Sequence, residues 1–433
     1  MKTVRCSLAA LALALLLCGV ARASGLWEEH GELREIKRCG PGVLYETHAS
    51  YGPLLIARVR GTHRDMGRQY GCLIGDRIMR VMQVYTDAPT PKDIRKSLIY
   101  RFCRNVWKHN EPHVPQEYKD EILGIAEGAR DAGHTVPPQV VEAGIALTNF
   151  SDMHDKQSMM AGAPLPHGHN APGLAFRTTC SSFVAWGSRT QHGRTFATRD
   201  LDWESKTGIN AYSLITVYEP ESEDGTPRNR YVTFGYAGLV GALAGMSDKG
   251  ITIGEIGATN TAETQDGVPW TIVMRRVLEE AQDLDHAVEI VMDSPNTLGY
   301  NFVIGSGDPQ NHGTDAYSPG GVAVEENRDF TAVFTADDPA EANAVWIDAQ
   351  GRPVLENGAP VPYGLPLPEA VFRADAALHP GIRRTQIADN GPARENGNGD
   401  PRTGGSYSKR YAPHFHMLEA LANGAEYTHH GRV

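Results

Sequence analysis

The chain has 433 residues, of which 41% are hydrophobic and 21% are charged, and its formal net charge is −11. This length suits one large domain or two ordinary ones. The acidic balance argues against a nucleic-acid partner, because binding phosphates requires a basic surface.

The first 23 residues have the pattern of a cleavable export signal. Lys2 and Arg5 give a positive start, the run Ser7–Ala21 is almost entirely apolar, and Ala23 supplies a small residue at its end. This run is too short for a comfortable membrane span and lies at the extreme N-terminus. We therefore expect residues 1–23 to be removed, leaving a secreted or periplasmic protein without a transmembrane anchor.

Residues 24–179 form the first part of the expected mature protein, and their pattern is mainly helical. Apolar residues recur every three or four positions from Met66 to Val81, which predicts an amphipathic helix after a strand at Tyr51–Val59. Two more helices are expected, at Gln116–Ala132 and Val140–Phe150.

The second part, residues 180–433, is rich in predicted strands. It follows Ser158–Gly173, a Gly-, Pro- and His-containing segment without periodicity that indicates a linker. Cys180–Trp186 and Thr195–Trp203 predict a hairpin. Later elements are expected as strands at Tyr212–Tyr218, Tyr231–Tyr236, Val240–Met246, Ile251–Ile256 and Tyr300–Gly305, a hairpin at Val322–Phe334, and helices at Trp270–Met292 and Tyr411–Ala422. Hairpins with helices inserted between them indicate an α+β fold.

Four cysteines remain once the export signal is removed. Cys39, Cys72 and Cys103 lie in the helical part, where an oxidising compartment would pair two of them. The sequence leaves the choice of pair open. Cys180 stands apart, in a small polar cluster that opens a strand.

The surroundings of Cys180 suit an activated nucleophile. The predicted hairpin folds Arg199 and Asp202 back beside it, which brings a guanidinium and a carboxylate near one thiol. A thiol is mostly protonated at neutral pH and needs a base or a positive neighbour to become a thiolate. A chain cut between Thr179 and Cys180 would supply that base, because the new α-amine has a reference pKa of roughly 7.7–8.0. Arg199 would keep the field positive, and Asp202 would orient the amine.

The hairpin sequence resembles a known family. Cys-Ser-Ser-Phe-Val-Ala-Trp-Gly, followed by Gly-Arg-Thr-Phe-Ala-Thr-Arg-Asp-Leu-Asp-Trp, is similar to the penicillin acyltransferase-like (acyl-coenzyme A:6-aminopenicillanic acid acyltransferase) family. That family is related to choloylglycine hydrolases, acid ceramidase and phospholipase B-like proteins. Arg199 and Asp202 match its Arg-Asn-x-Asp pattern, with Asp200 in place of Asn. The glycines from Gly61 to Gly71 resemble the family's opening pattern.

The resemblance implies a fold and a maturation step. The fold is a four-layered αββα sandwich with a helical N-terminal prosegment, in which two antiparallel sheets lie between helical layers. Self-cleavage would yield residues 24–179 and 180–433, which stay associated as one folded unit. No metal or organic cofactor is expected, and the substrate class is a small-molecule acyl amide.

The resemblance also implies further site residues. Asn260, at the end of a strand, and Asn301, at the start of another, correspond to oxyanion donors in relatives, although the register leaves Gly257 as a rival to Asn260. Arg410 resembles a late arginine that supports the nucleophile or binds a substrate carboxylate. The sequence leaves open the acyl and amine specificity, and the choice between hydrolysis and acyl transfer.

Other interpretations compete with this one. A free cysteine in a strand is most often an ordinary buried residue, and this is the structural interpretation of Cys180. In the same interpretation Arg199 and Asp202 form a structural ion pair. A phospholipase B-like ester hydrolase, or a secreted binding protein that keeps the fold without catalysis, would share the same pattern. A zinc hydrolase is the remaining alternative; the histidine pairs that suggest it lack a third ligand at a recognised spacing, and they are His167 with His169, His414 with His416, and His429 with His430.

Overall fold

A computed structural model describes residues 32–49, 52–153, 179–202, 208–346, 352–386 and 410–422. The predicted export signal (residues 1–23) and the predicted linker Ser158–Gly173 lie outside the described residues. Among the helices that the structure describes, none combines the length and apolar character that crossing a bilayer requires.

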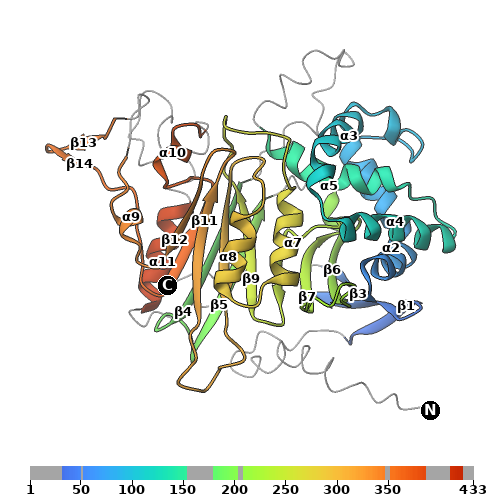
Figure 1. Ribbon diagram of the computed structural model, residues 1–433, viewed down its shortest axis with the longest axis horizontal. Coiled ribbons are helices and arrows are strands. Elements are labelled where there is room, and N and C mark those ends of the chain that lie inside the picture. Colours follow the sequence, from blue (N-terminus) through green and yellow to red (C-terminus); the bar gives the residue numbers. More distant parts are fainter. Residues whose placement is uncertain are drawn as a thin grey trace.

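A ten-stranded sheet runs through most of the molecule (Figure 1). Its strands, in spatial order, are β1 (Arg34–Cys39), β2 (Gly42–Ala49), β3 (Gly52–Gly61), β6 (Ser213–Pro220), β7 (Tyr231–Tyr236), β8 (Ala244–Ser247), β9 (Ile251–Gly257), β10 (Tyr300–Ser306), β11 (Gly320–Glu326) and β12 (Thr331–Thr335). The pairing of β3 with β6 is parallel, and the other neighbours are antiparallel. Strands from both parts of the chain therefore share one sheet.

A second, three-stranded sheet packs on one face of the first. It has the order β15 (Ala370–Arg373), β4 (Thr179–Gly187) and β5 (Gly193–Asp202). Val184 and Val371 of this sheet contact Ile256 of β9 and Val303 of β10 in one apolar cluster. A separate pair of two-residue strands comprises β13 (Leu355–Glu356) and β14 (Ala359–Pro360).

Helices cover the outer faces of both sheets. The longer ones are α2 (His63–Thr86), α3 (Leu98–Asn110), α4 (Gln116–Asp131), α5 (Pro138–Asp152), α7 (Trp270–Glu280), α8 (Leu284–Met292) and α11 (Ala412–Ala422), and the shorter ones are α9 (Pro339–Ala342), α10 (Pro380–Arg383), η1 (Ile94–Lys96), η2 (Glu111–His113) and η5 (Ile209–Tyr212). In Figure 1, α7 and α8 lie across the ten-stranded sheet.

Alternate residues of β9 and β10 explain the layers. Ile253 and Phe302 pack into the core that contains the helices, whereas Ile256 and Val303 pack against β4 and β15. Neighbouring residues of a strand point to opposite faces, so one strand serves both layers. On the far side of the smaller sheet, Tyr411 next to α11 packs on Phe372 of β15 with ring centroids 4.9 Å apart. The predicted α+β class and αββα layering are confirmed.

The predicted long helix at Trp270–Met292 is instead two helices. Ala281 is extended, with φ −64° and ψ 127°, and this ends α7. Asp283 then caps α8, because its carboxylate accepts a hydrogen bond of 2.8 Å from the backbone N–H of His286. The apolar periodicity continues across this break and gives no sign of it.

The glycines of the family-like opening pattern let two helices approach closely. A Cβ added at Gly67 would lie 2.2 Å from the carbonyl oxygen of Glu121, and one at Gly71 would lie 2.0 Å from that of Ile125. Helices α2 and α4 therefore touch backbone to backbone. The buried face of α4 includes the apolar residues Tyr118, Ile122, Ile125 and Ala129.

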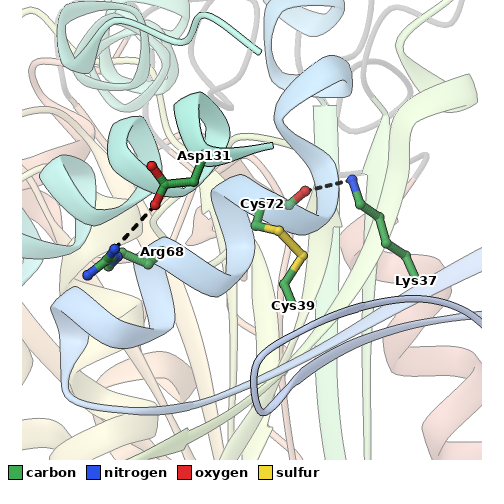
Figure 2. The surroundings of a disulfide bond; sticks show 5 residues. All are labelled: Lys37, Cys39, Arg68, Cys72 and Asp131. Carbon is green, nitrogen blue, oxygen red and sulfur yellow. Dashed lines mark hydrogen bonds and ion pairs between the residues drawn. A yellow bond between two sulfur atoms is a disulfide. The ribbon is translucent and has the colours of Figure 1, made fainter. Parts of the chain in front are cut away.

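A disulfide joins Cys39, at the end of β1, to Cys72 in α2 (Figure 2). The ammonium group of Lys37 donates a hydrogen bond of 2.7 Å to the carbonyl oxygen of Cys72 beside it. The sequence leaves open which two of Cys39, Cys72 and Cys103 pair, and the structure pairs Cys39 with Cys72. Cys103, in α3, is buried and has a free thiol.

Candidate active site

The register of the β4/β5 hairpin places Cys180 and Arg199 on the same face. Cys180 lies opposite Leu201, and Ser182 lies opposite Arg199. Directly opposed residues share a face in an antiparallel pair, as do residues two apart along a strand. Cys180 is 1% exposed and packs with Ile256 and other residues in the cluster between the two sheets.

Arg199 connects the cysteine thiol to a buried carboxylate. Its Nη2 lies 3.5 Å from the Sγ of Cys180 and 3.1 Å from Oε2 of Glu255. Its Nε donates a second hydrogen bond, of 3.1 Å, to the backbone oxygen of Glu255. The guanidinium is therefore held in one orientation by Glu255 while it contacts the thiol.

Gly254 makes room for this arginine. A Cβ at position 254 would lie 2.9 Å from Cγ of Arg199 and 2.9 Å from Oγ of Ser182. Cβ atoms essentially never approach other heavy atoms so closely. Arg199 can therefore lie against β9 at this point because residue 254 has no side chain.

Burial dominates the electrostatics of the thiol. It raises the pKa of Cys180 to about 12, although Arg199 acts in the opposite direction and lowers this pKa. The carboxylates of Glu255 and Asp375 add to the increase. Burial likewise raises the pKa of Glu255 to about 8, against the charge of Arg199. In the uncut chain, Cys180 is therefore a protonated thiol at neutral pH.

Asp202 lies on the other side of the hairpin. It pairs with Thr179 in the β4/β5 register, one residue away from the Cys180–Leu201 pair, so its side chain points to the opposite face. Its carboxylate forms an ion pair with Arg410, whose Nη1 also lies 3.2 Å from Oδ2 of Asp200. Of the two residues predicted beside the thiol, the structure places Arg199 in contact with it, whereas Asp202 faces Arg410.

Asp375 is a site residue that the sequence pattern did not reveal. Its Oδ1 accepts a hydrogen bond of 2.9 Å from the backbone N–H of Cys180, and the residue is fully buried. It follows β15 and lies 195 residues after Cys180 in the chain. No local motif marks it, because only the pairing of β15 with β4 brings the two together.

The two predicted oxyanion donors support the segment that carries Asp375. Asn301 is fully buried and donates hydrogen bonds from Nδ2 to the backbone oxygens of Ala374, at 2.8 Å, and Ala376, at 3.1 Å. Asn260 donates from Nδ2 to the backbone oxygen of Ile382, at 3.1 Å. Both amides are thus engaged with the chain around α10, and their role toward an oxyanion stays a prediction.

The histidine pairs do not assemble a metal site within the described residues. No group of three or more His, Cys, Asp or Glu side chains suited to a metal ion occurs in that part of the chain. His414 bonds through Nδ1 to the backbone oxygen of Arg410, at 2.7 Å, and packs on Phe183. The pairs His167 with His169 and His429 with His430 lie outside the described residues.

A mostly apolar pocket lies between α2, α5 and the segment after β7. Its lining includes Tyr85, Gly144, Leu147 and Leu239. Neither Cys180 nor any residue that contacts its thiol lines this pocket. The reacting centre suggested by the hairpin therefore lies elsewhere, between the two sheets.

Comparison with known proteins agrees with the family resemblance. Residues 188–320 match the family of acyl-coenzyme A:6-aminopenicillanic acid acyl-transferase. The matched segment contains Arg199, Asn260 and Asn301; Cys180 precedes it and Asp375 follows it. This match confirms the resemblance to the penicillin acyltransferase-like family.

The chain also has similar proteins in distant organisms. It is 28% identical over 336 residues to an uncharacterized protein of Archaeoglobus fulgidus, covering 76% of this chain and 51% of that protein. It is 21% identical over 287 residues to protein dcd1B of Dictyostelium discoideum, covering 62% of this chain and 51% of that protein. The chain thus spans about half the length of these curated relatives.

Among solved structures, one similar chain is the Caenorhabditis elegans ortholog of N-acylethanolamine-hydrolyzing acid amidase. The sequence identity is 16% and the TM-score is 0.27, and the alignment covers 36% of this chain and 64% of that one. Similarity at this level carries no argument about substrate.

Proposed function

We propose that the protein is an N-terminal-nucleophile acyl hydrolase that cleaves a linear amide bond through an acyl-enzyme on Cys180. The observation that carries this proposal is the contact of 3.5 Å between the Arg199 guanidinium and the Cys180 thiol. It lies in the hairpin whose sequence resembles the penicillin acyltransferase-like family.

The raised pKa of Cys180 supports a requirement for the cut before the thiol acts on a separate substrate, whereas the cut itself is an intramolecular attack on the neighbouring carbonyl. With a pKa of about 12, the thiol needs a base to release its proton, and the nitrogen of an intact peptide bond is not one. Cleavage between Thr179 and Cys180 converts that nitrogen into an amine with a reference pKa of roughly 7.7–8.0. The thiol, its base and the positive neighbour Arg199 are then complete.

Maturation is an N-to-S acyl shift followed by hydrolysis. The Sγ of Cys180 attacks the carbonyl carbon of Thr179, the C–N bond breaks, and the thiol proton ends on the departing nitrogen. Water then hydrolyses the thioester, which releases the carboxylate of Thr179 and regenerates the thiol. The products are the chains 24–179 and 180–433 of one folded unit.

Turnover repeats the same chemistry on a substrate amide. The α-amine takes the thiol proton, and the thiolate attacks the substrate carbonyl carbon. Asn260 and Asn301 are the candidate donors to the oxyanion, which requires a rearrangement of their present hydrogen bonds. The α-amine then protonates the leaving amine as the C–N bond breaks, and water releases the acyl group.

Hydrolysis is preferred to acyl transfer on account of the predicted location. The N-terminal signal pattern indicates export, and an exported enzyme rarely meets an acyl-coenzyme A donor. The expected substrate is a small-molecule acyl amide. No cofactor takes part in any of these steps.

Intact mass and N-terminal sequencing of the purified protein test the proposal. The wild-type chain is expected to yield a fragment that begins at Cys180, whereas Cys180→Ala stays whole. Cys103→Ser is the matched control, because Cys103 is also a buried free cysteine but lies in α3, away from the hairpin. This variant is expected to cut like the wild type.

A folded wild-type chain that stays whole would leave Cys180 without a free amine and would overturn the mechanism. That outcome would favour the binding protein that keeps the fold without catalysis. A cut chain that hydrolyses esters but no amide would favour the phospholipase B-like alternative.

A further inference from the structure

We propose that Asp375 is the residue that positions the Cys180 nitrogen, first as a peptide N–H and then as the catalytic α-amine. The sequence pattern alone predicts Asp202 for this task. The inference rests on the proposed function, because it concerns the base created by the cut between Thr179 and Cys180.

The geometry of the uncut chain already contains this contact. Oδ1 of Asp375 accepts the hydrogen bond of Cys180 N–H at 2.9 Å, in a fully buried environment. When the nitrogen becomes an amine, the same oxygen faces a group that carries a positive charge once it has taken the thiol proton. A hydrogen bond between an ammonium and a carboxylate is roughly twice as strong as one between neutral groups.

The carboxylate is held in place by the backbone around it. Asn301 bonds to the carbonyl oxygens on both sides of Asp375, those of Ala374 and Ala376. Gln386 donates from Nε2 to the carbonyl oxygen of Asp375, at 2.6 Å, and accepts from the N–H of Ala377, at 3.1 Å. These bonds fix the position of the Asp375 backbone in the uncut chain, and those of Gln386 do not depend on Asn301.

Asp202 is less well placed for the same task. Its carboxylate is partly exposed and pairs with Arg410, on the face of the hairpin opposite to the Cys180 side chain. Arg410 in turn bridges Asp202 and Asp200. The ion pair therefore ties β5 to the chain that enters α11.

The chemistry assigns a definite effect to Asp375. In turnover the thiol proton moves to the amine and then to the leaving amine, so the amine alternates between neutral and charged forms. A carboxylate at hydrogen-bond distance favours the charged form and raises the pKa of the amine. Without it, the amine is a weaker base and takes the thiol proton less readily.

Two substitutions separate the charge of Asp375 from its size. Asp375→Asn is nearly isosteric but uncharged, whereas Asp375→Glu keeps the charge on a longer side chain. The rate at which each full-length variant produces the fragment beginning at Cys180 is measured by mass spectrometry. We expect self-cleavage of Asp375→Glu to be faster than that of Asp375→Asn. Self-cleavage of Asp375→Asn should be at least tenfold slower than that of the wild type. If Asp375 had a purely structural role, Asp375→Asn would cut faster than Asp375→Glu, because Asn preserves the packing.

The pKa of the α-amine gives a second, substrate-free measurement. It is read from the pH dependence of the ¹⁵N chemical shift in cut protein labelled with [¹⁵N]cysteine. Asp375→Asn is expected to lower this pKa by about one unit, a tenfold change in proton affinity. Asp202→Asn is the competing arm, and it is expected to leave the pKa in place.

The outcomes distinguish failure of this inference from failure of the proposed function. A wild type that stays whole, or a Cys180→Ala variant that is cut, removes the proposed function. A wild type that cuts normally while Asp375→Asn cuts faster than Asp375→Glu overturns the inference alone. The inference is also overturned if Asp202→Asn lowers the amine pKa and Asp375→Asn does not, or if both Asp375 variants fail to fold.

Discussion

Arg199 reaches the Sγ of Cys180 with the same Nη2 atom that contacts the carboxylate of Glu255, at 3.5 Å and 3.1 Å respectively. One cation is therefore shared between a thiol and the carboxyl group of a buried glutamate. Whatever changes the charge, the position or the partner of this guanidinium is expected to change the reactivity of Cys180.

Replacing Arg199 tests its charge and its geometry separately. Among the strongest influences on the pKa of Cys180, only that of Arg199 lowers it. Arg199→Gln removes this influence. We expect self-cleavage to slow by at least tenfold, or about 1.4 kcal/mol in the barrier. Arg199→Lys keeps the charge but loses the fork that grips Glu255, and an intermediate rate is expected. Equal rates for wild type and Arg199→Gln, followed by mass spectrometry, would contradict this role.

Adding one methyl group on β9 is expected to displace the same arginine. In Gly254→Ala, the new Cβ would lie 2.9 Å from Cγ of Arg199, so the side chain must shift. Slower self-cleavage is expected without loss of Arg199 itself. Gly144→Ala is the control, since its Cβ would meet Met82 and Gly238 at ordinary distances of 3.7 Å and 3.8 Å. If both variants cut themselves at the wild-type rate, Arg199 need not be held in this position.

The buried Glu255 is expected to make stability depend on pH. Burial raises its pKa from 4.5 to about 8, so between these values the folded state holds a proton that the unfolded state releases. The free energy of unfolding should therefore fall as the pH rises through this window. Glu255→Gln lacks this proton, and its free energy of unfolding should fall less. Denaturant titrations at several pH values check the difference, and parallel curves for the two proteins would refute it.

The disulfide between Cys39 and Cys72 is expected to stabilise the fold without joining the two products of cleavage. A closed loop with a sequence separation of 33 contributes about 3–4 kcal/mol by restricting the unfolded chain. Reductant should lower the melting temperature of the wild type but not that of a Cys39→Ala, Cys72→Ala variant. Because both cysteines precede Thr179, the two products should remain together in reductant during gel filtration. Separation of the products there would contradict this assignment.

The sequence predicted the hairpin of the candidate site almost to the residue. Strands expected at Cys180–Trp186 and Thr195–Trp203 are observed at Thr179–Gly187 and Gly193–Asp202. A hairpin is a local structure, so its alternating residues and its turn are written in one short stretch of sequence. The register then places Arg199 beside Cys180 without further information.

The remainder of the site depends on contacts that no short stretch of sequence encodes. Glu255 follows Arg199 by 56 residues, and Asp375 follows Cys180 by 195. Glu255 reaches the centre because two sheets stack, and Asp375 reaches it because β15 pairs with β4. Both arrangements are properties of the whole fold. Asp202 shows the converse limit, since nearness in sequence suggested a shared site while strand alternation points it to the opposite face.

The parallel pairing of β3 with β6 gives the N-terminal part a task in folding. Strand β3 hydrogen-bonds to the edge of β6 over seven paired positions, from Leu55 with Leu214 to Gly61 with Pro220. A chain of residues 180–433 synthesised alone would leave this edge bare, and bare strand edges recruit other chains. The N-terminal part would then supply β3 to the ten-stranded sheet permanently, before and after the cut. Supplying it on a separate polypeptide should rescue the larger piece from aggregation.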